Sequence, residues 1–140
     1  MEPTDRRIVD LLRQDGRLSF TDLGKQLGLS TSAAHQRVRR LEERGVITGY
    51  TARIDAAKVG LAITAFISVI PVDPAAPDDI PDRLRELNEI EACYSVPGDE
   101  SYILKVRVAG PGGLEDLIAR IRSAAAVSTR TTVVLSTPWE

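Results

Sequence analysis

The sequence predicts an α+β protein with an N-terminal winged helix-turn-helix domain and a C-terminal ferredoxin-like βαββαβ domain. In the first third of the chain, apolar residues recur at spacings of three and four, with glycines between the segments. The rest alternates strand-like apolar runs with two helical patterns. Charge divides in the same way: residues 1–54 hold 10 Lys and Arg against 7 Asp and Glu, and residues 55–140 hold 8 against 13. We expect domains at 1–52 and 61–140, joined by a linker at 53–60.

Two short helices are predicted first. The first spans residues 5–15 and ends at Gly16. Its apolar residues form one face at i, i+3 and i+4, namely Ile8, Leu11 and Leu12. The second begins at a capping-box pattern, in which Ser19 precedes Asp22 by three residues, and ends at Gly28. Because this second helix is short, its stability depends on packing rather than on helix propensity.

A third helix is predicted from Ser30, its N-cap, to about Arg44. Its buried stripe follows an i, i+4, i+7 spacing and consists of Ala34, Val38 and Leu41. Polar and cationic residues cover the opposite side and the flanks of this stripe. After Gly45, the extended run at residues 46–47 predicts strands that form a wing.

The second and third helices, joined through a glycine-containing turn, form a helix-turn-helix whose second helix enters the DNA major groove. Small hydroxyls and free N–H groups at its start suit phosphate, Gln36 can read a base edge, and the arginines can pair with guanine or phosphate. The candidate DNA-contacting residues are Lys25, Ser30, Thr31, Ser32, His35, Gln36, Arg37, Arg39 and Arg40. The alternative is a solvated helix face with i, i+4 pairs such as Arg39–Glu43.

The C-terminal half reads as four strands and two helices in the order β-α-β-β-α-β, which is the ferredoxin-like motif. The strands are expected at residues 61–70, 91–96, 101–109 and 127–136. The helices are marked by the periodic apolar residues Ile80, Leu84 and Leu87, and by Leu114, Leu117, Ile118 and Ile121. Both helices cover one face of the sheet, so apolar residues on the other face need a partner. We therefore expect a homodimer formed through the sheet.

Several classes of protein are disfavoured. No apolar run reaches the roughly 18 residues of a membrane span, and the N-terminus has no apolar segment typical of a signal peptide. The single Cys93 excludes an internal disulfide and is expected to be buried in its strand. With one histidine and no metal-ligand, Ser-His-Asp or paired-carboxylate arrangement, we expect no metal, no cofactor and no enzymatic activity, in a cytoplasmic setting.

Several segments resemble the Lrp/AsnC (feast/famine) transcriptional regulators, of the actinobacterial type. They are residues 5–8, 28–30, 37–50 (RVRRLEERGVITGY), 93–102 (CYSVPGDESY) and 130–135 (RTTVVL). The resemblance implies a winged helix-turn-helix followed by an ACT-like ligand-sensing (RAM) domain, and a regulator that acts at the nucleoid. It also implies dimers that commonly build octamers, an amino-acid effector bound where dimers meet, and binding to spaced, often bent, double-stranded DNA sites.

The resemblance further implies an effector loop at residues 96–102. Backbone N–H groups around its glycine can hold the carboxylate of a free amino acid, and Asp99 or Glu100 can pair with the ammonium. The candidate effector-binding residues are Val96, Gly98, Asp99, Glu100, Ser101, Tyr102, Thr129 and Thr131. Glu100 and Ser101 stand where the family more commonly has a Tyr-Asp type pair. The alternative is a plain hairpin loop.

Two other functions are considered. One branch with this architecture, the siroheme decarboxylases, is enzymatic, relies on histidines and has degraded DNA-binding helices. The third helix here keeps three arginines and one histidine, which favours the regulator. An amino-acid-sensing module that does not bind DNA is expected to lack cationic side chains on this helix.

Overall fold

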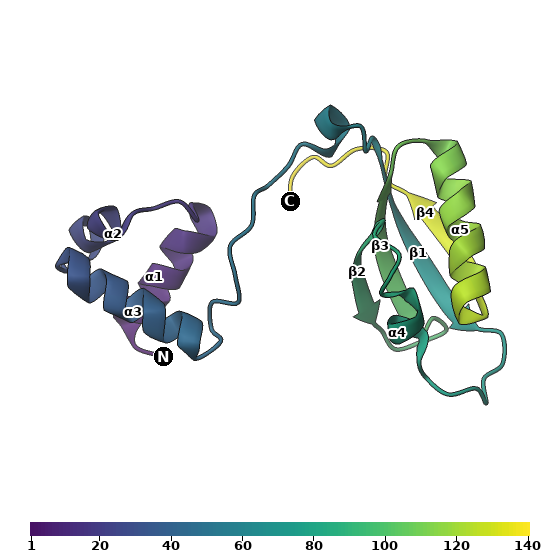
Figure 1. Ribbon diagram of the computed structural model, residues 1–140, viewed down its shortest axis with the longest axis horizontal. Helices are drawn as coiled ribbons and strands as arrows, with labels where there is room; N and C mark the ends of the chain where they lie inside the picture. Colours follow the sequence, from purple (N-terminus) through teal and green to yellow (C-terminus); the bar gives the residue numbers. More distant parts are fainter. The chain divides into compact units, whose positions relative to one another are not determined.

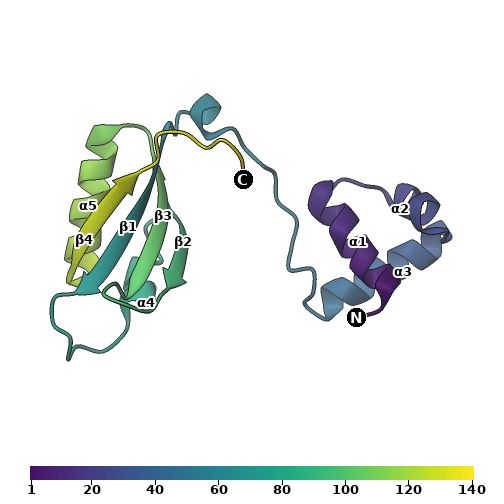
Figure 2. The ribbon, with the colours of Figure 1, turned by 180° about the vertical axis from the view of Figure 1, so that it is seen from behind.

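The computed structural model describes residues 1–140 as two compact units, Met1–Arg53 and Ile54–Glu140, which we call the head and the body. Figures 1 and 2 show helices without a sheet in the head, and a sheet with helices in the body. The second unit includes Ile54 and a short 3-10 helix, Ala56–Val59. No helix is both long enough and apolar enough to cross a membrane.

The head contains α1 (Pro3–Gln14), α2 (Phe20–Leu27) and α3 (Thr31–Glu43). Its core consists of the predicted inward residues of the three helices, Ile8, Leu23, Ala34, Val38 and Leu41. Ser19 Oγ accepts from the N–H of Asp22 at 3.0 Å, and Ser30 Oγ accepts from the N–H of Ala33 at 3.1 Å. Both predicted N-caps are therefore confirmed.

Gly24 allows α2 to lie against the turn that leads into α3. A Cβ atom at this position would lie 2.5 Å from the carbonyl oxygen of Leu29. The N–H of Leu29 also bonds to the carbonyl of Gly24 at 2.8 Å, so the helix and the turn are held in direct backbone contact. The importance of Gly24 for this turn was not predicted. A glycine in the middle of a short helix, where it costs helix stability, was the available signal.

The wing strand expected after α3 does not form. The N–H groups of Val46 and Ile47 both bond to the carbonyl of Leu41, at 2.9 and 3.1 Å. These bonds satisfy the Leu41 carbonyl in the last turn of α3, and the segment that follows carries no strand. The prediction of extended structure at this point was wrong because the two residues close the helix instead of pairing with a strand.

The body contains β1 (Ile63–Pro71), α4 (Ile80–Leu84), β2 (Ile90–Ser95), β3 (Tyr102–Val108), α5 (Pro111–Ala125) and β4 (Val127–Val133). The strand order is β2-β3-β1-β4, and every neighbouring pair is antiparallel. In Figures 1 and 2, α4 and α5 lie on the same face of the sheet. This arrangement confirms the predicted ferredoxin-like fold.

The body core lies between the sheet and the two helices α4 and α5. Alternate residues of β1, among them Ile67, are fully buried together with Leu104 of β3 and with Leu117 and Ile121 of α5. Cys93 is exposed, which corrects the prediction that it is buried. Because β2 is an edge strand whose second half is exposed, a side chain at this position is not enclosed.

Candidate nucleic-acid interface and ligand loop

Helix α3 presents a continuous polar and cationic surface. Eight of the nine candidate DNA-contacting residues are exposed, and Arg37 is the half-buried exception. The buried stripe of Ala34, Val38 and Leu41 anchors the opposite side of the helix. The exposed residues are Lys25, Ser30, Thr31, Ser32, His35, Gln36, Arg39 and Arg40.

Hydroxyl groups organise the start of α3. The Oγ of Ser30 lies 3.3 Å from that of Ser32, and Thr21 and Thr31 approach each other at 3.3 Å between their side-chain oxygens, which links α2 to α3. The first N–H groups of a helix have no partner within it and lie at the positive end of its dipole. Apart from the N–H of Ala33, which Ser30 caps, they face small side chains that let an anion approach closely.

The three arginines in the middle of α3 differ in their partners. Arg39 pairs with Glu43 at 3.1 Å, with both side chains more than 60% exposed, at 69% and 63%. Such a surface pair contributes little and exchanges easily for another anion. Arg40 makes no ion pair, whereas Arg37 makes two, with Glu2 at 2.7 Å and Asp5 at 2.9 Å.

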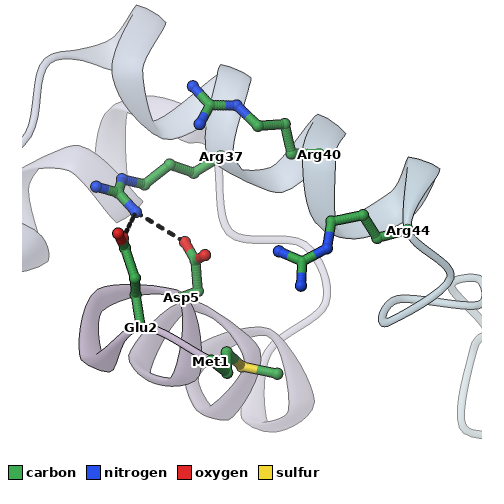
Figure 3. Close-up of a pocket in the computed structure, with 6 residues that line it drawn as sticks. All are labelled: Met1, Glu2, Asp5, Arg37, Arg40 and Arg44. Atoms are coloured by element: carbon green, nitrogen blue, oxygen red, sulfur yellow. Dashed lines mark hydrogen bonds and ion pairs between the residues drawn. The ribbon is translucent and has the colours of Figure 1, made fainter.

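Arg37 lies in a hollow of about 320 Å³ between α3 and the start of α1, lined by Met1, Glu2, Asp5, Arg37, Arg40 and Arg44. Figure 3 shows Glu2 and Asp5 both directed at its guanidinium, while the Arg40 guanidinium points away from them. The hydrogen bonds that Arg37 donates to Glu2 and Asp5 raise its pKa. These acidic partners were not foreseen, because they lie more than 30 residues away in the sequence.

His35 stacks on Phe20. Their ring centroids are 4.5 Å apart, and the rings are tilted by 47°. Phe20 opens α2 and His35 lies on α3, so this contact joins the two helices at the exposed side. Phe20 was missed as part of this surface. An aromatic residue between the cap and the first polar turn of α2, in a chain poor in aromatics, was the available signal.

The predicted effector loop connects β2 to β3 at one end of the sheet. Gly98 has φ +106°, a conformation that favours glycine. The N–H of Val96 bonds to the carbonyl of Ser101 at 3.2 Å, and the N–H of Ser101 bonds to Val69 of β1 at 3.0 Å. Arg130 on β4 donates to Glu100 at 3.4 Å. The loop is therefore attached to two further strands.

The strand register sets the other predicted effector residues. Val69 pairs with Tyr102 on one side and with Thr129 on the other, so these three residues form a row across the sheet. With strands about 4.8 Å apart, Thr129 is about 10 Å from Tyr102. Thr131 lies one step further along β4, opposite Ile67. The structure thus brings the two threonines to the same sheet face as Tyr102, but two strands away from it.

Three polar neighbours of this region were not predicted. Tyr102 donates to Asp78 at 2.8 Å, a bond that raises the pKa of Tyr102. Arg122 of α5 donates to Thr129 at 3.0 Å, and Arg130 holds Glu100. The side chain of Asp99 is exposed and makes no ion pair. Because the three contacts join segments that are distant in the sequence, no local pattern indicates them.

Comparison with known proteins matches both units. Residues 1–48 match the family model described as winged helix-turn-helix DNA-binding, and residues 64–140 match the Lrp/AsnC ligand binding domain. The chain is 50% identical to the HTH-type transcriptional regulator LrpA of Mycobacterium tuberculosis, over 98% of this chain and 91% of that protein. It is 35% identical to the leucine-responsive regulatory protein of Escherichia coli K12, over 96% of this chain and 85% of that protein.

A solved structure of a feast or famine regulatory protein from M. tuberculosis, complexed with L-methionine, is also similar. It superimposes with a TM-score of 0.97 at 50% identity. The match covers 99% of this chain and 95% of that one.

Proposed function

Because this chain belongs to the Lrp/AsnC family of transcriptional regulators, we propose that it recognises specific double-stranded DNA sites through α3 and responds to a free amino acid. The observation that carries this proposal is the exposed polar and cationic face of α3, fixed in place by a buried aliphatic stripe on the opposite side. This is the arrangement by which a recognition helix enters a major groove. Acting on DNA, the protein would work in the cytoplasm at the nucleoid.

The side chains on this face have different roles in the proposal. Gln36 reads a base edge, because its amide both donates and accepts hydrogen bonds. Arg40, which has no acidic partner in the chain, contacts a backbone phosphate, and Arg39 exchanges Glu43 for DNA. Lys25 and the first turn of α3, Ser30 to Ser32, bind phosphate through charge and backbone N–H groups. His35, stacked on Phe20, flanks the groove.

The proposed effector is an amino acid at the loop between β2 and β3. The N–H groups around Gly98 hold its carboxylate, and the unpaired carboxylate of Asp99 or that of Glu100 receives its ammonium. Val96, Ser101 and Tyr102 form the rest of the loop, and Thr129 and Thr131 lie on β4, two strands away from Tyr102. The L-methionine complex of a 50% identical relative supports this class of ligand.

The sheet face that carries no helix is the proposed dimer interface. Phe66 and Ile103 of this face are only half-buried, and Ile70 is exposed at 38%. A two-fold pair of such faces would cover these residues with equivalent ones. We propose that dimers formed in this way assemble further, to octamers, and that effector binding at the loop changes that assembly or the affinity for DNA.

We propose no catalytic activity for the chain. The relatives carry the names of transcriptional regulators, and the roles assigned above use the one histidine and the arginines of α3 for DNA. A protein of the siroheme decarboxylase kind would bind a coloured tetrapyrrole and ignore duplex DNA. Absorbance spectra of the purified protein, combined with DNA mobility shifts, separate the two.

The DNA-binding proposal is tested with duplexes selected by the protein from a randomised pool. Gln36→Ala should relax base preference at one position of the selected site, at a cost of about 1–3 kcal/mol. Arg40→Ala should weaken binding to all duplexes. Arg85→Ala, an exposed arginine of the body, is the matched control and should leave both unchanged. Equal losses for Gln36→Ala on selected and random DNA would contradict base readout by this residue.

The effector proposal is tested by thermal shift with each of the twenty amino acids, followed by calorimetry and light scattering on every hit. Ligand that binds only the folded state raises the unfolding temperature by mass action, so weak effectors require high concentrations. Asp99→Ala should weaken binding and leave dimers intact, whereas Glu115→Ala, exposed on α5, should leave both unchanged. Unchanged affinity in Asp99→Ala would move the ammonium contact elsewhere.

A further inference from the structure

We propose that Glu2 and Asp5, which we call the carboxylate brace, set the DNA specificity of the head by withholding Arg37 from the DNA backbone. In this view Arg37 is a positioning residue, and Arg40 and Arg44 supply the phosphate contacts on this flank of α3. Residue type alone grouped Arg37 with the DNA contacts, and the brace changes that assignment. The inference rests on the proposed DNA-binding function and adds a control on its selectivity.

The carboxylate brace holds the guanidinium of Arg37 from one side. Both carboxylates approach the same nitrogen, Arg37 Nη1, at 2.7 Å from Glu2 and 2.9 Å from Asp5. Arg37 and its two acidic partners together carry a net charge of −1, so Arg37 adds no net positive charge that would attract a phosphate. Because the Asp5 side chain is only 14% exposed and that of Arg37 28%, this pairing is less screened by water than a fully exposed one.

The other arginines at this helix differ from Arg37 because their guanidinium groups are available to a phosphate. The Arg39–Glu43 pair is exposed on both sides and opens at little cost. Arg40 and Arg44 make no ion pair. Only Arg37 is held by two acids from another element, and its raised pKa reflects the same two hydrogen bonds. The packing of α3 does not by itself require Arg37 to be paired differently from the other arginines.

The spacing of the arginines along the helix determines where the free positive charge lies. Arg37, Arg40 and Arg44 lie at i, i+3 and i+7, so they share one flank of the helix, and all three line the hollow beside the start of α1. Figure 3 shows the brace at the Arg37 end of this row, with the guanidinium of Arg40 directed away from it. The positive charge available to DNA is therefore concentrated at Arg40 and Arg44.

The carboxylate brace should affect how well the protein distinguishes its specific DNA site from other sequences. Contacts to phosphate supply affinity on any sequence, whereas contacts to base edges discriminate. A third free arginine in the row would strengthen binding to every duplex and lower the ratio of specific to non-specific affinity. Neutralising Arg37 within the protein limits the affinity for DNA of any sequence, while its side chain still holds α1 against α3.

The salt dependence of DNA binding tests the brace, because its slope counts the phosphates that the protein neutralises. Affinity for random duplex DNA is measured against salt concentration in the full chain. Glu2→Gln/Asp5→Asn should steepen the slope by about 0.9 and tighten random-sequence binding several-fold, while the preference for the selected site falls. Arg37→Gln should leave the slope unchanged, and Arg40→Gln should reduce it by about 0.9.

Asp10→Asn/Asp15→Asn is the matched control, since it removes the same charge from α1 and its C-terminal boundary without touching Arg37. An increase in slope as large in this control as in the brace variant would overturn the inference, and so would a decrease for Arg37→Gln equal to that for Arg40→Gln. Should the double brace variant unfold, Glu2→Gln alone should act in the same direction, and an unchanged slope there would overturn it equally. A wild-type protein that binds no duplex would instead contradict the proposed function.

Discussion

The head and the body stabilise their helices by different means. In the head, five buried residues form the core, and α2 and α3 each begin at a serine whose side chain caps a backbone N–H. In the body, thirteen buried residues form the core, and neither α4 nor α5 has a side-chain cap. A small helical unit depends on the ends of its helices and on close backbone contacts, whereas a helix packed on a sheet is fixed by its apolar face.

The two proposed functional surfaces differ in the same sense. The proposed DNA-contacting residues come from one continuous stretch, 25–40, on two neighbouring helices. The surroundings of the proposed effector loop come from the ends of three strands and from α5, which meet only after the sheet has paired. A mutation that removes a helix cap or a close backbone contact should therefore damage the head selectively, whereas a matched substitution in the body should have little effect.

Gly24→Ala should have the largest effect. Its Cβ would lie 2.5 Å from the backbone oxygen of Leu29, so the turn must move, at a cost of about 1–3 kcal/mol. Gly113→Ala in α5 is the matched control: its Cβ would meet Val108 at an ordinary 3.5 Å, and alanine favours the helix by up to about 1 kcal/mol. Amide hydrogen exchange resolves the two units, and Gly24→Ala should lose protection in the head alone.

DNA binding should be weakened by Gly24→Ala and unaffected by Gly113→Ala. If both alanine variants showed equal protection in the head, the close approach of α2 to the turn would not be what fixes the helix-turn-helix angle. Loss of protection throughout the body would likewise remove the distinction between the units.

Ser30→Ala should have a smaller effect, confined to α3. It removes the acceptor for the N–H of Ala33 and should cost about 1 kcal/mol. Ser123→Ala, an exposed position in the last turn of α5, is the control and should be neutral or slightly stabilising, because alanine is the better helix former. Thermal unfolding followed by circular dichroism measures both. A loss for Ser123→Ala equal to that for Ser30→Ala would contradict the idea that caps matter more in the head.

The features that could be predicted from the sequence are those that depend on neighbouring residues. The caps at Ser19 and Ser30 and the buried stripe of α3 were predicted correctly, because each depends on residues within one or two helical turns. The β-α-β-β-α-β succession of elements in the body was also predicted, since alternation and turn residues repeat along the chain. These are local patterns, and local patterns carry into the structure when the packing agrees with them.

The errors arose where a distant partner decides the outcome. Arg37 looks like its neighbours in sequence, and only the fold brings Glu2 and Asp5 to it. Cys93 has the residue type of a buried position but lies on an edge strand. Val46 and Ile47 have strand propensity, yet their N–H groups close α3. In each case the sequence specifies the side chain, and a contact far along the chain, or the end of an element, specifies its role.

The smallest predicted effect concerns an ion pair in the body between Glu89 and Arg120 of α5. The hydrogen bond from Arg120 holds the pKa of Glu89 below its usual value of 4.5, against a smaller opposing effect of desolvation. A carboxyl whose pKa is lower in the folded protein stabilises it above the usual pKa, and that contribution disappears as the pH falls through the lowered value.

Glu89→Gln should therefore lower the unfolding temperature of the body at pH 7 by a few degrees at most, and the difference from wild type should vanish towards pH 3. Glu115→Gln, exposed on α5, should follow the wild type at every pH. A gap for Glu89→Gln that stays constant with pH would mean that packing of the side chain, rather than its charge on Arg120, supports the body.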